Sequence, residues 1–388
     1  MNAEQLLQIA AQYGTPLYVF DTDALDRRVQ AVGDAFGGSV RLCYSIKANP
    51  FLTGVVPIGV LEVCSPGELY VCRACKVPPE HILYSGVNKT MRCIEDALEY
   101  GVACLTAESP LHLARIEQAA AKRGVTVEGL LRLTGGDQFG MDEAAVRELV
   151  RTRAAFPHIR ITGLHFFSGT QKRNAKIIGR ELAMLSQFAD SLLRDFGFIT
   201  EKLEYGAGLF ADYFGENAQA CELQLLQDVA PHIRKAAERF TLTVEMGRFF
   251  TASCGYYLTT VEDVKTSDGK HYAIVDGGIH QINYDGLILA PAPPPVTALN
   301  NKSLPDTQWI LSGSLCTRAD ILARGAILPQ LRCGDILCFA QAGAYAITEG
   351  PALLLSRDIP AVVIANEADG AMLVRDHLTT HELNTRGS

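Results

Sequence analysis

Residues capable of acid–base or covalent chemistry stand directly after predicted β-strands of this chain, and Lys47 is the first of them. It follows an apolar run at 40–44, and the pair Asn49-Pro50 ends the strand just beyond it. Parallel α/β folds carry their catalytic groups at the carboxyl ends of strands. A lysine amine that is shielded from water there has a lowered pKa and can form an imine with a carbonyl compound. Taken alone, a lysine in this place is more often a surface residue.

Seven later strands end in the same way, with residue types that rarely fill a hydrophobic core. These strand ends carry Glu62 with Ser65, Ser85, Glu108, Arg132, His165 with Ser168, Gly206 with Gly208, and Glu245 with Arg248. One lysine, one histidine, one glycine-rich turn and one glutamate at the mouth of a single barrel are a stronger signal together than any of them alone.

The glycine-rich turn at 206–208 favours an anion site, because glycines let backbone N–H groups approach a phosphate closely. Phosphate sites in barrels commonly follow strands seven and eight, where Arg248 could complete this one. Glu245 could bond a ring nitrogen, and the imidazole of His165 could stack on a flat cofactor. Read separately, these residues could form a tight turn, a buried ion pair and a core histidine. Together with Lys47 they predict binding of pyridoxal 5′-phosphate and no metal.

Strands and helices alternate through the first two-thirds of the chain. The β-rich runs lie at 40–46, 61–64, 82–85, 103–106, 129–133, 161–167, 202–205 and 241–245. Helical spacing of apolar residues occupies 110–123, 142–156, 177–196 and 221–240, with shorter helices at 67–75 and 94–100. Eight such units predict an α/β fold of the (β/α)8 TIM-barrel type.

From about Cys254 the pattern changes to short strands at 256–264, 271–275, 309–311, 335–340 and 371–374, with no long helices between them. This predicts a C-terminal, mostly antiparallel β domain. We expect the cofactor-binding barrel at 19–252 and the β domain at 253–388, joined by the N-terminal segment 1–18. The β-rich run at 18–20 could belong to either part.

Composition excludes several classes of protein. The net charge is -8 with no long basic run, so nucleic acid is not an expected partner. No apolar stretch reaches membrane-spanning length, and the first residues do not form a signal peptide, which predicts a cytoplasmic protein. The chain has 11 cysteines, an odd number, and they are scattered through apolar segments. This pattern fits a protein of a reducing compartment better than a disulfide framework. Cys72 and Cys75 lack a second pair, so structural zinc is not expected.

The motifs resemble the fold-type III pyridoxal phosphate-dependent decarboxylases, the group of diaminopimelate, ornithine and arginine decarboxylases, over nearly the whole chain. Segment 44–49 resembles the cofactor-lysine motif, and 62–69 the second-strand motif, where the family usually has aspartate in place of Glu62. His165 matches the ring-stacking histidine and Ser168 the neighbouring phosphate contact. Segment 206–208 resembles a triple-glycine loop with Ala207 in the middle, and 245–248 resembles Glu-Pro-Gly-Arg with Met246 for proline. The resemblance implies an alanine racemase-like barrel whose cofactor contacts are Lys47, Glu62, Arg132, His165, Ser168, Gly206, Gly208, Glu245, Gly247 and Arg248.

The predicted β domain carries two further motifs of this family. Segment 313–320 resembles the stretch that bears the catalytic cysteine, here Cys316, and 343–345 resembles the Gly-Ala-Tyr whose tyrosine, here Tyr345, reaches the phosphate. In the family the cysteine enters the barrel of a partner subunit, so the resemblance implies a homodimer with composite active sites. It implies decarboxylation at Cα, with Lys47, His165, Glu245 and Cys316 as catalytic residues.

Two departures from the family concern the substrate. The amino-acid decarboxylases have an acidic residue where Thr317 stands, and segment 279–284 lacks the arginine of diaminopimelate decarboxylases. We expect Thr317, Asp320 and Tyr284 to bind substrate. Segments 138–142, 167–171 and 315–317 resemble a branch that acts in siderophore or antibiotic biosynthesis, on citryl-amino acids or a carrier-bound glutamyl group.

Three alternatives stay open at this point. The chain could decarboxylate free diaminopimelate or a basic amino acid. It could be an amino-acid racemase, although such racemases place an arginine against the ring nitrogen where this chain has Glu245. It could be a non-enzymatic carrier of pyridoxal phosphate, although proteins of that kind resemble the first domain only.

Overall fold

The computed structural model describes residues 1–102, 104–215, 217–284 and 292–387. Cα proximity divides the chain into two compact units. One contains residues 28–211 and 219–250, and the other contains residues 1–27, 212–218 and 251–388. The domain boundaries expected at 18/19 and 252/253 stay a prediction.

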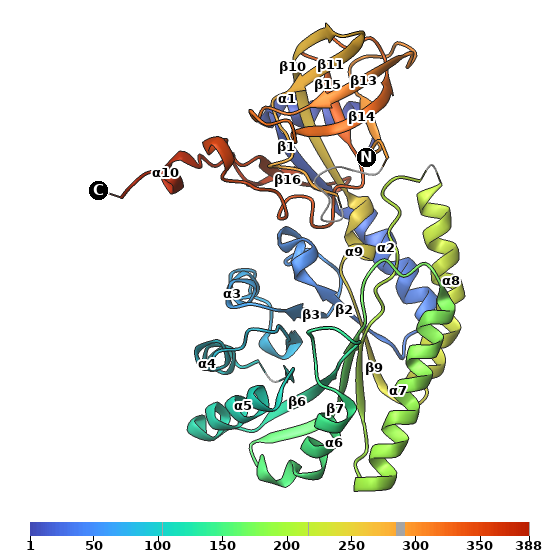
Figure 1. The fold of residues 1–388 in the computed structure, drawn as a ribbon, viewed down its shortest axis with the longest axis vertical. Coiled ribbons are helices and arrows are strands. Elements are labelled where there is room, and N and C mark those ends of the chain that lie inside the picture. The colour runs from blue at the N-terminus through green and yellow to red at the C-terminus, as the bar shows by residue number, and fades with distance from the viewer. Residues whose placement is uncertain (103, 216, 285–291, 388) are drawn as a thin grey trace. The chain divides into compact units, whose positions relative to one another are not determined.

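The first unit contains a closed barrel of eight parallel strands, as predicted (Figure 1). The strands are β2 (Arg41–Ser45), β3 (Val60–Val63), β4 (Ile82–Tyr84), β5 (Cys104–Ala107), β6 (Val127–Leu133), β7 (Ile159–Phe167), β8 (Lys202–Gly206) and β9 (Thr241–Met246). The barrel closes where β2 pairs with β9, in the register Cys43 opposite Glu245. Because every strand runs in the same direction, the residues that follow them gather at one end of the barrel.

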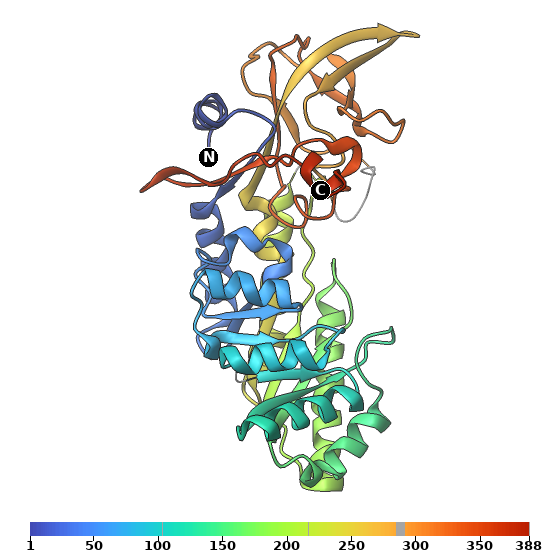
Figure 2. The ribbon, with the colours of Figure 1, turned by 90° about the vertical axis from the view of Figure 1, so that its left-hand side faces the viewer.

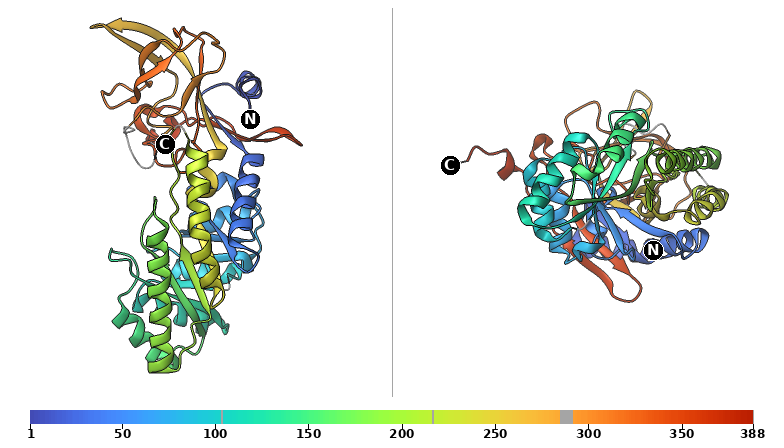
Figure 3. Two further views of the ribbon diagram at one scale, coloured as in Figure 1. Left: turned by 90° about the vertical axis from the view of Figure 1, so that its right-hand side faces the viewer. Right: turned by 90° about the horizontal axis from the view of Figure 1, so that it is seen from below.

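Helices connect these strands on the outside of the barrel. They are α3 (Pro66–Ala74), α4 (Met91–Tyr100), α5 (Pro110–Arg123), α6 (Glu143–Arg151), α7 (Ala175–Phe196) and α8 (Ala218–Ala237), and α2 (Thr22–Phe36) precedes β2. Figure 2 shows α3, α4 and α5 following one another along one side of the barrel. Helices α7 and α8 lie side by side (Figure 3), and Gly179 permits their approach, because a Cβ there would come within 2.7 Å of His232 Cε1.

Sequence patterns located most helix starts but overextended two helices: α8 ends at Ala237 instead of residue 240, and α6 ends five residues early. Asp142 caps α6 by accepting a hydrogen bond from the Ala145 N–H at 2.7 Å, as its position predicts. The helix expected to reach residue 156 ends at Arg151, and a 3₁₀ turn, Arg153–Ala155, follows it. The Thr152 hydroxyl donates to the Glu148 carbonyl at 2.7 Å and satisfies one of the last helical acceptors.

The second unit is built on a mostly antiparallel sheet, also as predicted. Its strand order is β14-β13-β11-β10-β1-β16-β17, with β15 paired to β10 and β12. The bounds are β1 (Leu17–Asp21), β10 (Gly255–Ser267), β11 (Lys270–Val275), β12 (Val296–Ala298), β13 (Thr307–Ser312), β14 (Ile321–Leu328), β15 (Ile336–Phe339), β16 (Ala361–Asn366) and β17 (Gly370–Arg375). The run at 18–20, which could have joined either part, is β1 of this sheet and pairs with β10 and β16.

Sequence reading missed strands β12, β14 and β16 and the first two helices, α1 (Ala3–Tyr13) and α2. Asn2 caps α1, whose buried face joins a core with Leu17, Val19, Leu258 and Val363. Strand β16 is buried at five of its six positions and so lacks the alternation typical of a half-exposed strand. Among the described residues, no helix combines the length and apolarity needed to cross a membrane.

Candidate active site

Lys47 lies in a 3₁₀ turn, Ile46–Ala48, directly after β2, where the sequence predicts it. The turn is fixed locally because the Tyr44 hydroxyl donates to the Asn49 carbonyl at 2.7 Å and the Asn49 side chain accepts from the Phe51 N–H at 3.1 Å. The lysine side chain is 40% exposed, so its amine reaches the mouth of the barrel from a rigid backbone.

Two carboxylates from other strands meet the Lys47 amine. Its Nζ atom lies 2.7 Å from Glu62 Oε2 and 3.4 Å from Glu245 Oε1. Glu62 and Glu245 come from β3 and β9, the two neighbours of β2 in the barrel. Both acids are nearly buried, with side-chain exposures of 3% and 9%.

Cys64 is a neighbour of this group that sequence reading missed. Its thiol donates to Glu62 Oε1 at 2.7 Å, and its sulfur lies 3.6 Å from Lys47 Nζ. Burial, reinforced by the charge of Glu62, raises the pKa of the Cys64 thiol far above its ordinary value, so it is a neutral donor. The signal was its position two residues after Glu62, which places both side chains on the same face of the strand.

These residues line one cavity of about 300 Å³ at the carboxyl end of the barrel. Its walls are Lys47, Glu62, Cys64, Gly86, Val87, Asn88, Arg132, Phe139, His165, Phe167 and Glu245. Five residues that were predicted to contact the cofactor are therefore brought together from five different strand ends. The cavity volume is at the lower end of the range typical of small-molecule sites.

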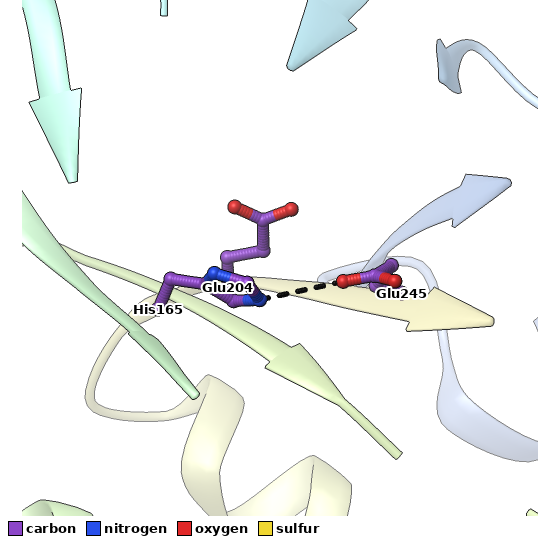
Figure 4. A group of neighbouring side chains, drawn as sticks. All are labelled: His165, Glu204 and Glu245. Atoms are coloured by element: carbon purple, nitrogen blue, oxygen red, sulfur yellow. Dashed lines mark ion pairs between the residues drawn. The ribbon is translucent and has the colours of Figure 1, made fainter. Parts of the chain in front are cut away.

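Glu245 is held in its ionised form. Burial alone would raise the pKa of this carboxyl, but the charge of Lys47, the imidazole of His165 and a hydrogen bond from Ser45 hold it well below its usual range. The Ser45 hydroxyl lies 2.6 Å from Glu245 Oε1, and His165 Nε2 lies 3.4 Å from Glu245 Oε2 (Figure 4). A permanent negative charge therefore stands beside a flat, buried imidazole.

Glu204 is a third acid close to this pair, and sequence reading also missed it. It stands on β8 between His165 of β7 and Thr243 of β9 in the sheet register (Figure 4). One ring nitrogen of His165 and one carboxylate oxygen from each of Glu204 and Glu245 lie within 4.8 Å of one another. It was missed because it precedes the glycine-rich turn instead of following its strand.

The glycine-rich turn after β8 has the tight geometry that an anion site needs. Gly208 has a φ of +57°, and a Cβ on it would come within 2.1 Å of the Gly169 carbonyl oxygen. A Cβ on Gly247, after β9, would come within 2.7 Å of the Ala48 Cβ. The turns after β8 and β9 therefore approach the loops after β7 and β2 closely, and only glycine fits.

Two further residues predicted at the phosphate have local roles in the fold. The Ser168 hydroxyl donates to Glu181, which also pairs with Lys172 Nζ at 2.8 Å. Arg248 is the first residue of the short helix α9 (Arg248–Thr251), directly after β9. Contacts of Ser168, Gly206, Gly208, Gly247 and Arg248 with a phosphate stay predictions.

Arg132 is held in a buried ion pair at the edge of the cavity. Its Nη1 lies 2.6 Å from Glu108 Oε1, and its guanidinium carbon lies 5.1 Å from the centre of the Phe139 ring. Glu108 Oε2 also accepts the Gly140 N–H at 3.3 Å. The pair joins β5 and β6, so Arg132 presents a fixed positive charge to the cavity.

The remaining predicted residues belong to the second unit. Cys316 and Thr317 are exposed on the loop between β13 and β14. The buried Asp320 carboxylate holds this loop, since it accepts the N–H groups of Ile279 at 2.9 Å and Leu315 at 2.7 Å. Tyr284 donates to the Ala340 carbonyl at 2.6 Å. Substrate binding by Thr317, Asp320 and Tyr284 stays a prediction.

Tyr345 has an unusual backbone conformation in the Gly-Ala-Tyr motif. Its φ of +62° is rare for an aromatic residue and costs about 1–3 kcal/mol. Gly343 before it is confined, because a Cβ there would come within 1.8 Å of the Thr251 carbonyl oxygen. Such strain at a motif residue is typical of a functional position, although the proposed contact of Tyr345 with a phosphate stays a prediction.

The donor set of the barrel cavity fits pyridoxal 5′-phosphate. Lys47 supplies an amine for the aldehyde carbon, and Glu245 supplies an ionised carboxylate for a protonated ring nitrogen. Neither ring nitrogen of His165 meets hydrogen-bond geometry within the described ranges, although Nε2 lies 3.4 Å from Glu245 Oε2, so the face of this buried imidazole is available to a flat ligand. Together they satisfy the amine, ring and charge requirements of this cofactor.

Comparisons with known proteins agree with this site. A sequence model of the family described as "Pyridoxal-dependent decarboxylase, pyridoxal binding domain" matches residues 22–252. The chain is 26% identical to an L-glutamyl-[BtrI acyl-carrier protein] decarboxylase of Niallia circulans, covering 100% of this chain and 99% of the relative. It is 31% identical to a diaminopimelate decarboxylase of Pseudomonas aeruginosa, covering 88% of this chain and 85% of that protein.

Solved structures show the same fold. A crystal structure of a diaminopimelate decarboxylase from M. jannaschii in complex with L-lysine has a TM-score of 0.86 at 22% identity, covering 97% of this chain and 93% of that one. The crystal structure of AQ1208 from Aquifex aeolicus has a TM-score of 0.84 at 25% identity, covering 97% and 92%. The predicted family and fold class are thus both confirmed.

Proposed function

Because the chain belongs to the pyridoxal-dependent decarboxylases, we propose that it removes the α-carboxylate of an amino-acid conjugate made in siderophore or antibiotic assembly. One observation carries the reaction type: the Lys47 amine lies 2.7 Å from Glu62 and 3.4 Å from Glu245 in a single cavity. Bound there, the cofactor would accept the electron pair that remains on Cα when carbon dioxide leaves.

The protein groups divide this work among them. Lys47 would hold the cofactor through its amine. Glu245 would stabilise a proton on the ring nitrogen, and His165 would support the ring. The near-complete burial of Glu245 and His165 removes water from around this charge and strengthens their electrostatic effect. An arginine in place of Glu245 would favour the racemase alternative, and the chain does not have it.

The second half of the reaction requires a proton donor at Cα. We assign this role to Cys316, whose thiol is free and exposed on the loop between β13 and β14. In this proposal Cys316 enters the barrel of a partner subunit, so the active enzyme is a homodimer with two composite sites. Size measurement in solution, together with complementation between Lys47→Ala and Cys316→Ala chains, tests the assembly.

The absence of two substrate-binding residue types supports a conjugated substrate: an acidic residue at position 317 and an arginine in segment 279–284. Thr317 cannot bind the distal ammonium group of a diamine as a carboxylate would, and segment 279–284 offers no arginine for a distal carboxylate. The relative that acts on a carrier-bound glutamyl group covers the full chain. Free diaminopimelate is the second candidate, since a relative at 31% identity carries that activity.

Carbon dioxide release from a substrate panel tests the proposal. The panel contains a citryl-amino acid, a glutamyl thioester on a carrier protein, and free diaminopimelate, lysine, ornithine and glutamate. We expect release from one of the conjugates, none from Lys47→Ala, and unchanged release from Lys176→Ala, an exposed lysine in α7. Exchange of the Cα hydrogen with solvent deuterium while the carboxylate is retained would refute decarboxylation and favour a racemase.

A further inference from the structure

Glu204 is a buried carboxyl group that the chemistry above does not use. Its side chain points into the barrel from β8, and the residue is 1% exposed. Neither carboxylate oxygen has a hydrogen-bond partner among the residues that the structure describes. Most buried carboxyl groups are paired or hydrogen-bonded, because an isolated ionised carboxylate in a protein interior is strongly unfavourable. The burial of Glu204 therefore favours the neutral, protonated carboxyl group.

Toward the carboxyl end of the barrel, Glu204 neighbours His165 and Glu245, which line the reaction cavity. It lies level with His165 in the register of β7 and β8, and its neighbour on β9 is Thr243, two residues before Glu245. One carboxylate oxygen of Glu204, one ring nitrogen of His165 and one carboxylate oxygen of Glu245 lie within 4.8 Å of one another (Figure 4). A proton on Glu204 is therefore close enough to affect both the imidazole and the acid that face the cofactor.

On its lower side Glu204 lines a second cavity of about 120 Å³. Most residues around that cavity stand at or near the start of a barrel strand. The cavity therefore lies at the amino end of the barrel, opposite the reaction site. Its charged walls include Arg41, Glu80, Glu128 and Lys202. A cavity of this size with several polar walls can hold water. Glu204 thus stands between a polar cavity and the reaction cavity.

We propose that Glu204 is a positioning residue that holds a proton beneath the cofactor site and exchanges it with solvent through the amino-end cavity. With that proton in place, Glu245 carries the negative charge beside His165. Without it, two carboxylates within 4.8 Å would compete for the proton on the cofactor ring. Only the use of this proton in catalysis rests on the proposed function. Decarboxylation takes up one proton in each turnover (R–COO⁻ + H⁺ → R–H + CO₂).

The surroundings support a neutral Glu204. Burial raises the pKa of this carboxyl to about 7, with His165 opposing the shift and Glu245 adding to it. The titratable and charged groups that face it come from the surrounding strands and from the 3₁₀ turns after β2 and before β4. They are Arg41, Cys43, Lys47, Glu62, Glu80, Cys104, Glu128, His165, Lys202 and Glu245. Lys202 is paired with Glu128 at 2.6 Å, so this nearby cation is already shared with another acid.

Infrared spectroscopy of the cofactor-free protein tests the proton directly. We expect a protonated-carboxyl C=O band that disappears as the pH rises through about 7. The band should be absent from Glu204→Gln and present in Glu80→Gln, whose substituted residue is exposed and lines the same cavity. A band that survives in Glu204→Gln, or a wild-type protein without one, would overturn the proposal. Glu204→Asp keeps the carboxyl and should keep a titrating band even if its position shifts.

The same band tests the route of exchange in the cofactor-loaded protein. After transfer to D₂O the band should shift as fast with the cofactor bound as without it, because the amino-end cavity stays open. A shift that becomes at least about tenfold slower on loading would show exchange through the mouth of the barrel and refute the route. Neither measurement uses substrate. Both results would therefore still test the protonation of Glu204 if the proposed decarboxylase activity proved wrong.

A spectroscopic readout of the bound cofactor completes the test. We expect Glu204→Gln to bind pyridoxal 5′-phosphate within about threefold of the wild-type affinity, since glutamine mimics the neutral acid. Its absorbance titration should lose one inflection near pH 7 that the wild type and Glu80→Gln show. An unchanged titration curve in Glu204→Gln would refute a role for this carboxyl in the protonation of the site.

Discussion

Replacing Glu204 by glutamine should stabilise the cofactor-free protein at high pH and have little effect at low pH. The folded protein favours the neutral acid, because burial raises the pKa of Glu204 from its ordinary 4.5 to about 7. The unfolded chain ionises at the ordinary value and so binds fewer protons between these two pH values. Wild-type stability therefore falls as the pH rises through this window, whereas glutamine has no proton to lose.

The magnitude follows from the same pKa change. A pKa that moves from 4.5 to about 7 corresponds to about 3 kcal/mol once the pH is above both values. Between about pH 5 and about pH 9, the stability difference between Glu204→Gln and wild type should grow by roughly 2–3 kcal/mol in favour of the variant. The assay is urea unfolding of both proteins without cofactor at one protein concentration, at several pH values across this range.

The matched control is Glu80→Gln, which removes an exposed carboxyl beside the same cavity. Its stability relative to wild type should not change across the pH range. A constant difference for Glu204→Gln would mean that Glu204 titrates at the same pH in the folded and unfolded states. A difference that grows in the opposite direction would mean that folding favours the ionised form and that burial does not raise the pKa of Glu204.

Three further substitutions test the cavity. Glu245→Gln should lower the rate of carbon dioxide release by about 10²–10³-fold while Lys47 still binds the cofactor, measured by kcat and by cofactor absorbance; a full rate would refute its role at the ring nitrogen. Glu108→Gln leaves the buried Arg132 without its 2.6 Å partner and should cost about 3–5 kcal/mol in urea unfolding; a cost near zero would contradict a buried pair. Gly208→Ala forces a Cβ to 2.1 Å from a carbonyl oxygen at a φ of +57°, so cofactor affinity should fall at least about tenfold in a fluorescence titration, and wild-type affinity would show that the turn can relax.

Sequence patterns predicted the barrel well because each of its units repeats the same local signal. A β-rich run, a polar strand end and an amphipathic helix recur, and right-handed parallel connections leave few ways to arrange them. The second sheet was harder, since its strand order joins β1 to β10 and β16, from opposite ends of the chain. No local pattern encodes that pairing, and β16 is buried on both faces.

The sequence by itself determined the residues that follow each barrel strand, because parallel strands must end at the same side of the barrel. That rule was enough to gather Lys47, Glu62, His165 and Glu245 and to predict the cofactor they suit. Only the tertiary structure decided which partners these groups have. It placed Cys64 against Lys47, engaged Ser168 with Glu181, and left Glu204 buried beneath His165 with no hydrogen-bond partner among the described residues. Such choices depend on side-chain packing across the barrel, which brings together residues far apart in the chain and sets their burial and charge.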